Sequence, residues 1–296
     1  MKQLFLTAIC AAATFGTVKA ANDIKLQYDP QLVSAGFPSP LLRGTIRGQS
    51  VWFLVDTGAG VHVIASWFAK SAQIPTKQGR TRARGSTGAE VLVSAASGET
   101  IRIDGTNQEL RLRQAAVIEF PAKFEEQKIA GLISPQLLSP KGQAAILDLR
   151  EPRLSFGPPP EPTVGTRICR NPESPFENLS YAAPVTSGDV EAVMVVDTGA
   201  TGTTVSPAST LGSTLAPRAT QSKERIQGVG APPQSIKTVS GVPLKFGDGQ
   251  VTITVSLGGP ASSTCGPAGT LGMDALRQCK LVMGGGTFAW SCGSAR

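Results

Sequence analysis

Short runs of apolar residues dominate this chain, and polar, Gly-rich or Pro-rich turns separate them. Some of these runs alternate apolar and polar side chains and others are rich in Val, Ile and Leu, and both patterns indicate β-strands. The predicted strands are residues 23–28, 41–46, 51–55, 100–103, 110–118, 145–149, 153–156, 183–186, 193–196, 242–246, 251–255, 280–283 and 287–290. Short helices are expected only at residues 65–71 and 134–138. Many short strands and few helices predict an all-β fold.

Two of the apolar runs end in the same sequence. Residues 51–59 read Val-Trp-Phe-Leu-Val-Asp-Thr-Gly-Ala, and residues 193–200 read Val-Met-Val-Val-Asp-Thr-Gly-Ala. A single Asp-Thr-Gly is a weak signal, because Asp and Gly are ordinary turn residues. Each copy therefore predicts, at the least, a buried strand that delivers a carboxylate to a turn.

Further landmarks repeat with the tripeptide. Gly131 follows the first acid, Asp56, by 75 positions, and Gly272 follows the second acid, Asp197, by 75 positions. A Gly-rich hairpin tip lies between the landmarks of each half, and each half closes on a further pair of predicted strands. One order and one spacing indicate a duplicated unit in which each copy supplies one acid.

The paired motifs resemble those of the retropepsin-like and pepsin-like aspartic proteases, in which Asp-Thr-Gly-Ala is followed by a strand of the form apolar-apolar-Gly. The resemblance covers nearly the whole chain after residue 20. It implies a bilobal all-β fold of two homologous β-barrel-like lobes, each of about six to eight strands, with a cleft between them. The expected organisation is a signal peptide at residues 1–20, an N-terminal lobe at 21–157, a Pro-rich linker at 158–171 and a C-terminal lobe at 172–296.

The resemblance also implies an aspartic-type endopeptidase whose catalytic acids are Asp56 and Asp197. Like charges held about 3 Å apart cannot both ionise, so one pKa is expected to rise and the other to fall, and the pair shares a proton. The ionised acid would take a proton from a water, while the protonated acid donates to the carbonyl oxygen. The apparent pKa values belong to the pair, so neither residue is assigned a fixed role.

The residues directly after each acid have expected supporting roles. Gly58 and Gly199 would let the backbone pass close to the carboxylates and direct N–H groups at them, where a side chain would obstruct. By the same resemblance, Thr57 and Thr198 would hydrogen-bond across to the opposite lobe. These bonds would hold the two acids in one plane.

Four further positions are expected to shape the site. Gly131 and Gly272 would run directly behind the active-site turns, where a Cβ has no room. Ala59 and Ala200 stand where pepsins usually carry a hydroxyl, which lowers the pKa of the neighbouring carboxylate. The missing hydroxyls predict a less acid pH optimum than that of pepsin.

Two hairpin tips are candidates for a flap that contacts substrate. The first consists of Gly85, Ser86, Thr87 and Gly88, and the second consists of Gly228, Val229 and Gly230. The first tip lacks the Tyr that pepsin flaps carry, whereas the second is similar to a retroviral flap tip. Glycines at both tips would suit a mobile lid, and plain hairpin turns are the alternative.

The first residues predict export. Lys2, an apolar run over residues 4–15 and Val18-Lys19-Ala20 form the pattern of a bacterial secretory signal peptide that is cleaved after Ala20. No run is long enough to span a bilayer, so a periplasmic or secreted protein without a membrane span is expected. Residues 1–20 contain two lysines and no acid, so their removal lowers the formal charge from +7 to +5. Such a mild charge does not call for a nucleic-acid partner.

Four cysteines remain after residue 20, and all lie in the second half: Cys169, Cys265, Cys279 and Cys292. An even number in an exported chain predicts two disulfides, for which three pairings are possible. We expect Cys265 to pair with Cys279, and Cys169 with Cys292, since the second bond would tie the start of the C-terminal lobe to its last strand. Neither a cofactor nor a metal is expected, because no Cys-x-x-Cys is present and His62 is the only histidine. His62 is expected to pack or to make a local hydrogen bond.

The leading interpretation is an enzyme that acts on a polypeptide substrate, as a monomer because one chain carries both acids. The alternative is a catalytically silent peptide- or protein-binding module on the same two-lobe fold, since a fold does not establish an activity. A purely structural β-protein would require the duplicated acid turn to be accidental. Both acids, both threonines and both glycines are intact, which favours the enzyme.

Overall fold

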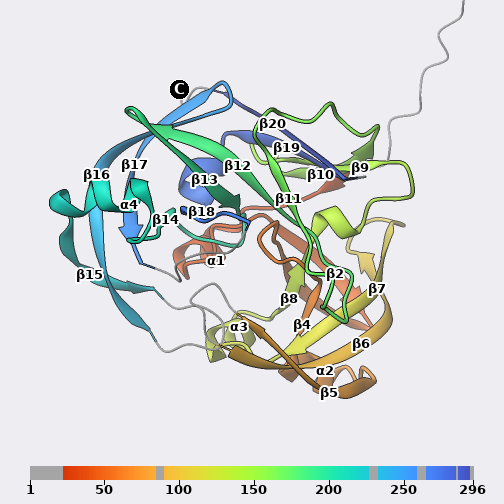
Figure 1. The fold of residues 1–296 in the computed structure, drawn as a ribbon. Coiled ribbons are helices and arrows are strands. Elements are labelled where there is room, and N and C mark those ends of the chain that lie inside the picture. The colour runs from red at the N-terminus through yellow and green to blue at the C-terminus, as the bar shows by residue number, and fades with distance from the viewer. Residues whose placement is uncertain (1–22, 85–89, 227–232, 259–264, 285, 294–296) are drawn as a thin grey trace, which may run out of the picture.

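The computed structural model describes residues 23–84, 90–226, 233–258, 265–284 and 286–293. Within these ranges the strands form three sheets and the helices are short, which confirms the predicted all-β class. Figure 1 shows one barrel at the lower right, a second barrel at the left and a sheet that joins them at the upper right. The chain therefore has two lobes, as the repeat predicted.

The first barrel is built from seven strands of the described chain. They are β2 (Leu41–Ile46), β3 (Gln49–Val55), β4 (Val63–Ala65), β5 (Thr76–Arg84), β6 (Glu90–Ile103), β7 (Glu109–Ile118) and β8 (Ile129–Ile133). Their order is β2-β3-β8-β4-β7-β6-β5, and an additional pairing of β2 with β6 closes the barrel. β3 and β8 run parallel, with Phe53 beside Gly131.

The second barrel repeats this order over the described residues. Its strands are β11 (Arg167–Cys169), β12 (Ser180–Ser187), β13 (Val190–Val196), β14 (Thr204–Val205), β15 (Thr220–Ile226), β16 (Gln234–Phe246), β17 (Gly249–Leu257) and β18 (Gly269–Leu271). The order is β11-β12-β13-β18-β14-β17-β16-β15, and β12 also pairs with β16. β13 and β18 run parallel, as β3 and β8 do. Equivalent strands have equivalent partners, so the duplication in sequence is a duplication in structure.

A five-stranded sheet of the described chain joins the halves. It consists of β1 (Ile24–Lys25), β10 (Arg153–Gly157), β9 (Ala144–Asp148), β19 (Cys279–Gly284) and β20 (Thr287–Cys292), in that order. β9 from the first half pairs with β19 from the second, with Leu147 beside Leu281. Because backbone hydrogen bonds cross between the halves here, the two barrels are held on one common base.

The helices fill the connections between strands. They are α1 (Pro30–Ser34), α2 (Ser66–Ser71), α3 (Ala122–Glu126), α4 (Thr210–Leu215) and α5 (Met273–Leu276), with 3₁₀ turns η1 (Pro135–Leu137) and η2 (Ala216–Arg218). The predicted helices at residues 65–71 and 134–138 correspond to α2 and η1. The others were not predicted. In α1 the carboxylate of Asp29 accepts hydrogen bonds from the backbone N–H groups of Gln31 and Leu32, which caps the helix.

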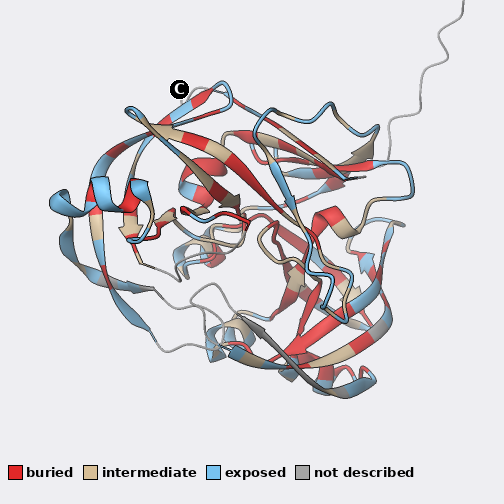
Figure 2. Ribbon diagram, viewed as in Figure 1, coloured by how far each residue is buried: buried red, intermediate tan, exposed pale blue. Residues whose placement is uncertain are grey.

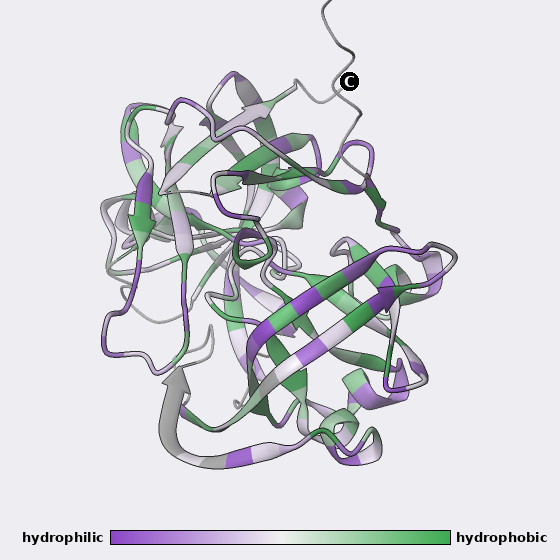
Figure 3. Ribbon diagram, turned by 90° about the vertical axis from the view of Figure 1, so that its right-hand side faces the viewer, coloured by the Kyte–Doolittle hydropathy of each residue, from purple (hydrophilic) through white to green (hydrophobic). Residues whose placement is uncertain are grey.

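The alternation of side chains places the core inside the barrels. On β7, Leu110 and Leu112 are buried while Glu109, Arg111 and Arg113 are exposed. Figure 2 shows this as alternating red and blue along the strands, and Figure 3 shows it as green and purple bands. The buried set is mainly Val, Leu, Ile and Ala, with few aromatic rings. No helix in the described ranges is long and apolar enough to cross a membrane.

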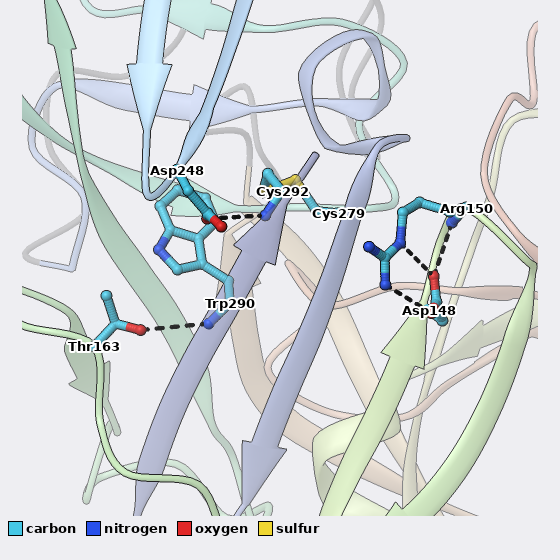
Figure 4. Close-up of a disulfide and its surroundings, with 7 residues drawn as sticks. All are labelled: Asp148, Arg150, Thr163, Asp248, Cys279, Trp290 and Cys292. Atoms are coloured by element: carbon cyan, nitrogen blue, oxygen red, sulfur yellow. Dashed lines mark hydrogen bonds and ion pairs between the residues drawn. A yellow bond between two sulfur atoms is a disulfide. The ribbon is translucent and has the colours of Figure 1, made fainter. Parts of the chain in front are cut away.

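Both disulfides are present, but the predicted pairing is wrong. Cys279 bonds to Cys292, and Cys169 bonds to Cys265. Cys279 and Cys292 are register partners on the adjacent strands β19 and β20, with Cα atoms 4.0 Å apart. Figure 4 shows this bond beside Trp290. Since strand register already brings these two cysteines together, Cys279 is not free to reach Cys265.

Several predicted features lie outside the described residues: the signal peptide at residues 1–20 and the hairpin tips at residues 85–88 and 228–230. The strands that lead to those tips are described, since β5 pairs with β6 and β15 pairs with β16. In the predicted linker, residues 158–166 contain no helix or strand, whereas β11 at Arg167–Cys169 pairs with β12. The end of that segment therefore already belongs to the sheet of the second barrel.

Candidate active site

Asp56 and Asp197 follow equivalent strands, β3 and β13, and lie against each other where the two barrels meet. Their carboxyl groups are close enough for each to shift the pKa of the other. Each acid also faces the turn of the other half: a Cβ added to Gly58 would overlap the carboxyl of Asp197, and one added to Gly199 would overlap that of Asp56. Glycine at both positions is what allows the acids to approach.

Each carboxylate is held by its own turn. Oδ1 of Asp56 accepts hydrogen bonds from the N–H groups of Gly58 at 2.8 Å and Ala59 at 2.9 Å. The corresponding N–H groups of the second turn donate to Oδ1 of Asp197 at 2.8 Å and 3.0 Å. One oxygen of each acid is thus fixed by two donors, as expected for N–H groups directed at the carboxylates.

Two threonines cross-link the turns. The hydroxyl of Thr57 donates to the carbonyl of Val196 at 2.7 Å and accepts from the N–H of Thr198 at 3.1 Å. The hydroxyl of Thr198 donates to the carbonyl of Val55 at 2.7 Å and accepts from the N–H of Thr57 at 3.1 Å. Both threonines are fully buried. Four buried hydrogen bonds therefore fix the two acid-bearing turns relative to each other.

The surroundings raise the pKa of both acids above the ordinary value of 3.8. Burial is the largest cause for Asp197, whose pKa is raised well above that value, and the charge of Asp56 raises it further. Burial also raises the pKa of Asp56, against hydrogen bonds from the N–H of Ala59, from Asp197 and from the N–H groups of Gly58 and Gly199. This differs from the expectation that one pKa would fall, because burial disfavours charge on both carboxyls. The shared proton belongs to the pair rather than to either residue.

Gly131 on β8 and Gly272, which directly precedes α5, are tightly enclosed, and a Cβ has no room at either position, as expected. A Cβ on Gly131 would overlap the carbonyl of Val63 on β4, and one on Gly272 would overlap the backbone of Gly202. Both glycines lie beside the chain that leaves the active-site turn. The requirement for glycine comes from backbone packing against that departing segment.

His62 is buried and lies beside the first turn. Its Nδ1 accepts a hydrogen bond from the N–H of Ser134 at 3.1 Å, and desolvation lowers its pKa to about 4. The imidazole is therefore neutral at neutral pH. This agrees with the predicted packing and local hydrogen bonding.

Two residues that support the first turn were missed by the sequence analysis. The hydroxyl of Ser134 lies 2.6 Å from the carbonyl oxygens of both Ala59 and Val61. The side-chain amide of Gln136 donates to the carbonyls of Thr57 and Ala59. Both follow Gly131 at the end of the repeat, and no pattern of residue types pointed to them.

Across the described ranges, no group of three or more His, Cys, Asp or Glu side chains is arranged to hold a metal ion. A cavity of about 580 Å³ lies in the second barrel, lined by residues that include Pro184, Val193, Ser206 and Leu211. It does not include the acid pair.

A comparison with known protein families agrees with the paired-acid geometry. Residues 42–134, which contain Asp56 and Gly131, match the family model described as aspartyl protease. A search of curated proteins found no match. The second acid turn lies beyond the matched residues but has the same strand order and the same hydrogen bonds. Residues 42–134 are therefore similar to the aspartyl protease family, and the all-β, two-lobe fold of the described chain is consistent with an aspartic-protease-like fold.

Proposed function

We propose that this protein is an exported aspartic endopeptidase in which Asp56 and Asp197 together activate a water molecule. The observation that carries the proposal is the close approach of two carboxyl groups from the two repeats, buried at Asp56 and half-buried at Asp197, each held by two backbone N–H groups and each lying against the glycine of the other turn. One acid alone would not explain catalysis, whereas two adjacent acids can act as proton donor and proton acceptor at the same site.

The raised pKa of Asp197 supports a working state with one shared proton. The ionised member of the pair removes a proton from the water as the water oxygen attacks the peptide carbonyl carbon. The protonated member donates to the carbonyl oxygen, which avoids a free oxyanion. When the tetrahedral intermediate collapses, the acid that took the proton from water gives it to the leaving amine as the C–N bond breaks. One hydroxyl of the intermediate returns its proton to the other acid and becomes the carbonyl of the new carboxyl group, so the pair regains its starting protonation.

Export is supported by the two disulfides, because such bonds persist in oxidising compartments. A periplasmic or secreted location and removal of residues 1–20 are part of the proposal. The substrate is a polypeptide, and the protein acts as a monomer because one chain supplies both acids. The two hairpins β5–β6 and β15–β16 are the candidates for contacting that substrate.

The test is incubation of the mature protein with unstructured casein between pH 3 and pH 7, with and without pepstatin. We expect new peptides by mass spectrometry that pepstatin suppresses. Peptide binding without cleavage at any pH would refute the enzyme and leave the binding module. Cleavage that pepstatin does not affect would be traced with Asp56→Asn, and persistence in that variant would refute the paired-acid mechanism.

A further inference from the structure

Gln136 is a buried side chain that links the first active-site turn to the second half of the chain. It lies in η1 (Pro135–Leu137) and is 4% exposed. Its Nε2 is 3.3 Å from the carbonyl oxygen of Thr57, 3.2 Å from that of Ala59 and 2.8 Å from that of Leu179. All three neighbours are acceptors, so the amide must present its NH₂ group here. The first two belong to the acid turn and the third precedes β12.

The two turns are supported by different means. In the first turn the carbonyl of Ala59 accepts from the hydroxyl of Ser134 and from Gln136. In the second turn the equivalent carbonyl, that of Ala200, accepts from the backbone N–H of Met273 at 2.9 Å. A backbone donor is set by the fold, whereas a side-chain donor depends on residue type. The carbonyl of Ala59 is therefore the one of the two whose hydrogen bonds a side-chain change can remove.

The second half offers a matched comparison. Arg277 stands five positions after Gly272, as Gln136 stands five positions after Gly131. Its side chain is directed elsewhere, with the guanidinium 4.4 Å from the ring centroid of Tyr28. The repeat thus places residues at equivalent positions, and of the two it is Gln136 that contacts an acid turn in the described structure.

We propose that Gln136 is a positioning residue for the proposed reaction. By donating to both the first turn and Leu179, it fixes Asp56 relative to the half that carries Asp197. It touches neither acid, so it acts through the backbone of the turn. This inference rests on the proposed function for its kinetic consequence and on the structure alone for its effect on the acid pair.

The test compares Gln136→Met, which keeps the length of the side chain and removes both donors, with Arg277→Met as the control. In the Met variant of Gln136 we expect kcat on a quenched peptide to fall about tenfold, the rate equivalent of about one hydrogen bond, with little change in KM. We also expect the pH titration of the acid pair, followed by carboxyl ¹³C signals, to shift. Arg277→Met should change neither quantity.

Gln136→Glu separates positioning from packing. A protonated carboxyl still donates one hydrogen bond, whereas an ionised one donates none and repels three carbonyl oxygens. The activity of Gln136→Glu should therefore stay near that of the parent protein at acid pH and fall as pH rises. If Gln136→Met does not fold, Gln136→Glu alone tests the positioning role. Unchanged kcat and unchanged titration in the Gln136 variants would overturn the proposal. If the parent protein hydrolyses nothing, the proposed function fails, and the ¹³C titration alone decides the role of Gln136.

Discussion

The cross-lobe threonine network gives the sharpest test of how the acids are held. Thr57→Val keeps the branched shape of the side chain and removes its hydroxyl. Two buried backbone groups, the carbonyl of Val196 and the N–H of Thr198, then lose their partner. Each buried group left unpaired costs about 1–3 kcal/mol, so the substitution should cost about 2–6 kcal/mol of unfolding free energy. That is a large part of the roughly 5–15 kcal/mol of a typical domain.

Thr57→Ser is the matched control, because it keeps the hydroxyl and removes only a methyl group. Thr57→Ser should lower the free energy of unfolding by about 1 kcal/mol. The assay is urea unfolding followed by Trp fluorescence, with kcat/KM measured on the same samples. Thr198→Val removes the equivalent pair of bonds and should lose a similar amount. A Val variant of Thr57 as stable as the parent protein, or more stable than the Ser variant, would refute this reasoning.

Four further predictions concern the acids, their turns and one disulfide. Because the folded-state pKa of Asp197 is raised, this carboxyl stabilises the protein at low pH, and the stabilisation is lost as pH rises through that pKa. Asp197→Asn should therefore raise Tm at pH 7 and raise it less near pH 3.8, and an equal rise at both pH values would contradict this. Since burial raises the pKa of both Asp56 and Asp197, both limbs of the pH–rate profile should lie at higher pH than ordinary aspartates would give. An optimum near pH 2 would contradict this prediction. Gly58→Ala should abolish hydrolysis, because the added methyl overlaps the Asp197 carboxyl; near-normal kcat would show that the turn adapts. Replacing Cys169 and Cys265 by Ala opens a link between residues 96 positions apart and should cost up to about 5 kcal/mol in denaturant unfolding, whereas no change in midpoint would mean that this bond is dispensable.

Much of the architecture was readable in the sequence because it is set by local patterns. Alternation and β-branched runs indicate strands, and the 75-residue spacing from each acid to its glycine indicates the duplicated barrels. The approach of Asp56 to Asp197 was implied by the resemblance to aspartic proteases, and the duplicated acid turn is the feature that carries this resemblance.

Other features depend on register or on contacts between distant segments. The bond between Cys279 and Cys292 follows from the register of β19 and β20. The two cysteines do lie just outside the two ends of the predicted hairpin, which is a signal that could have been used. The cap at Asp29 before a Pro was likewise a readable start of α1. The role of Gln136 was not readable, because it depends on Leu179 approaching from the other half. The pKa of Asp56 also depended on how deeply the pair is buried, which residue types alone do not give.

The central claim is that the two acids act as one unit. The most direct measurement is kcat/KM on a quenched peptide for the parent protein, Asp56→Asn, Asp197→Asn and the double variant. If the acids share one proton and one water, each single change should reduce the rate by several orders of magnitude and the double change should reduce it no further. A single variant that keeps activity within about tenfold of the parent protein, or losses that add in the double variant, would contradict the account.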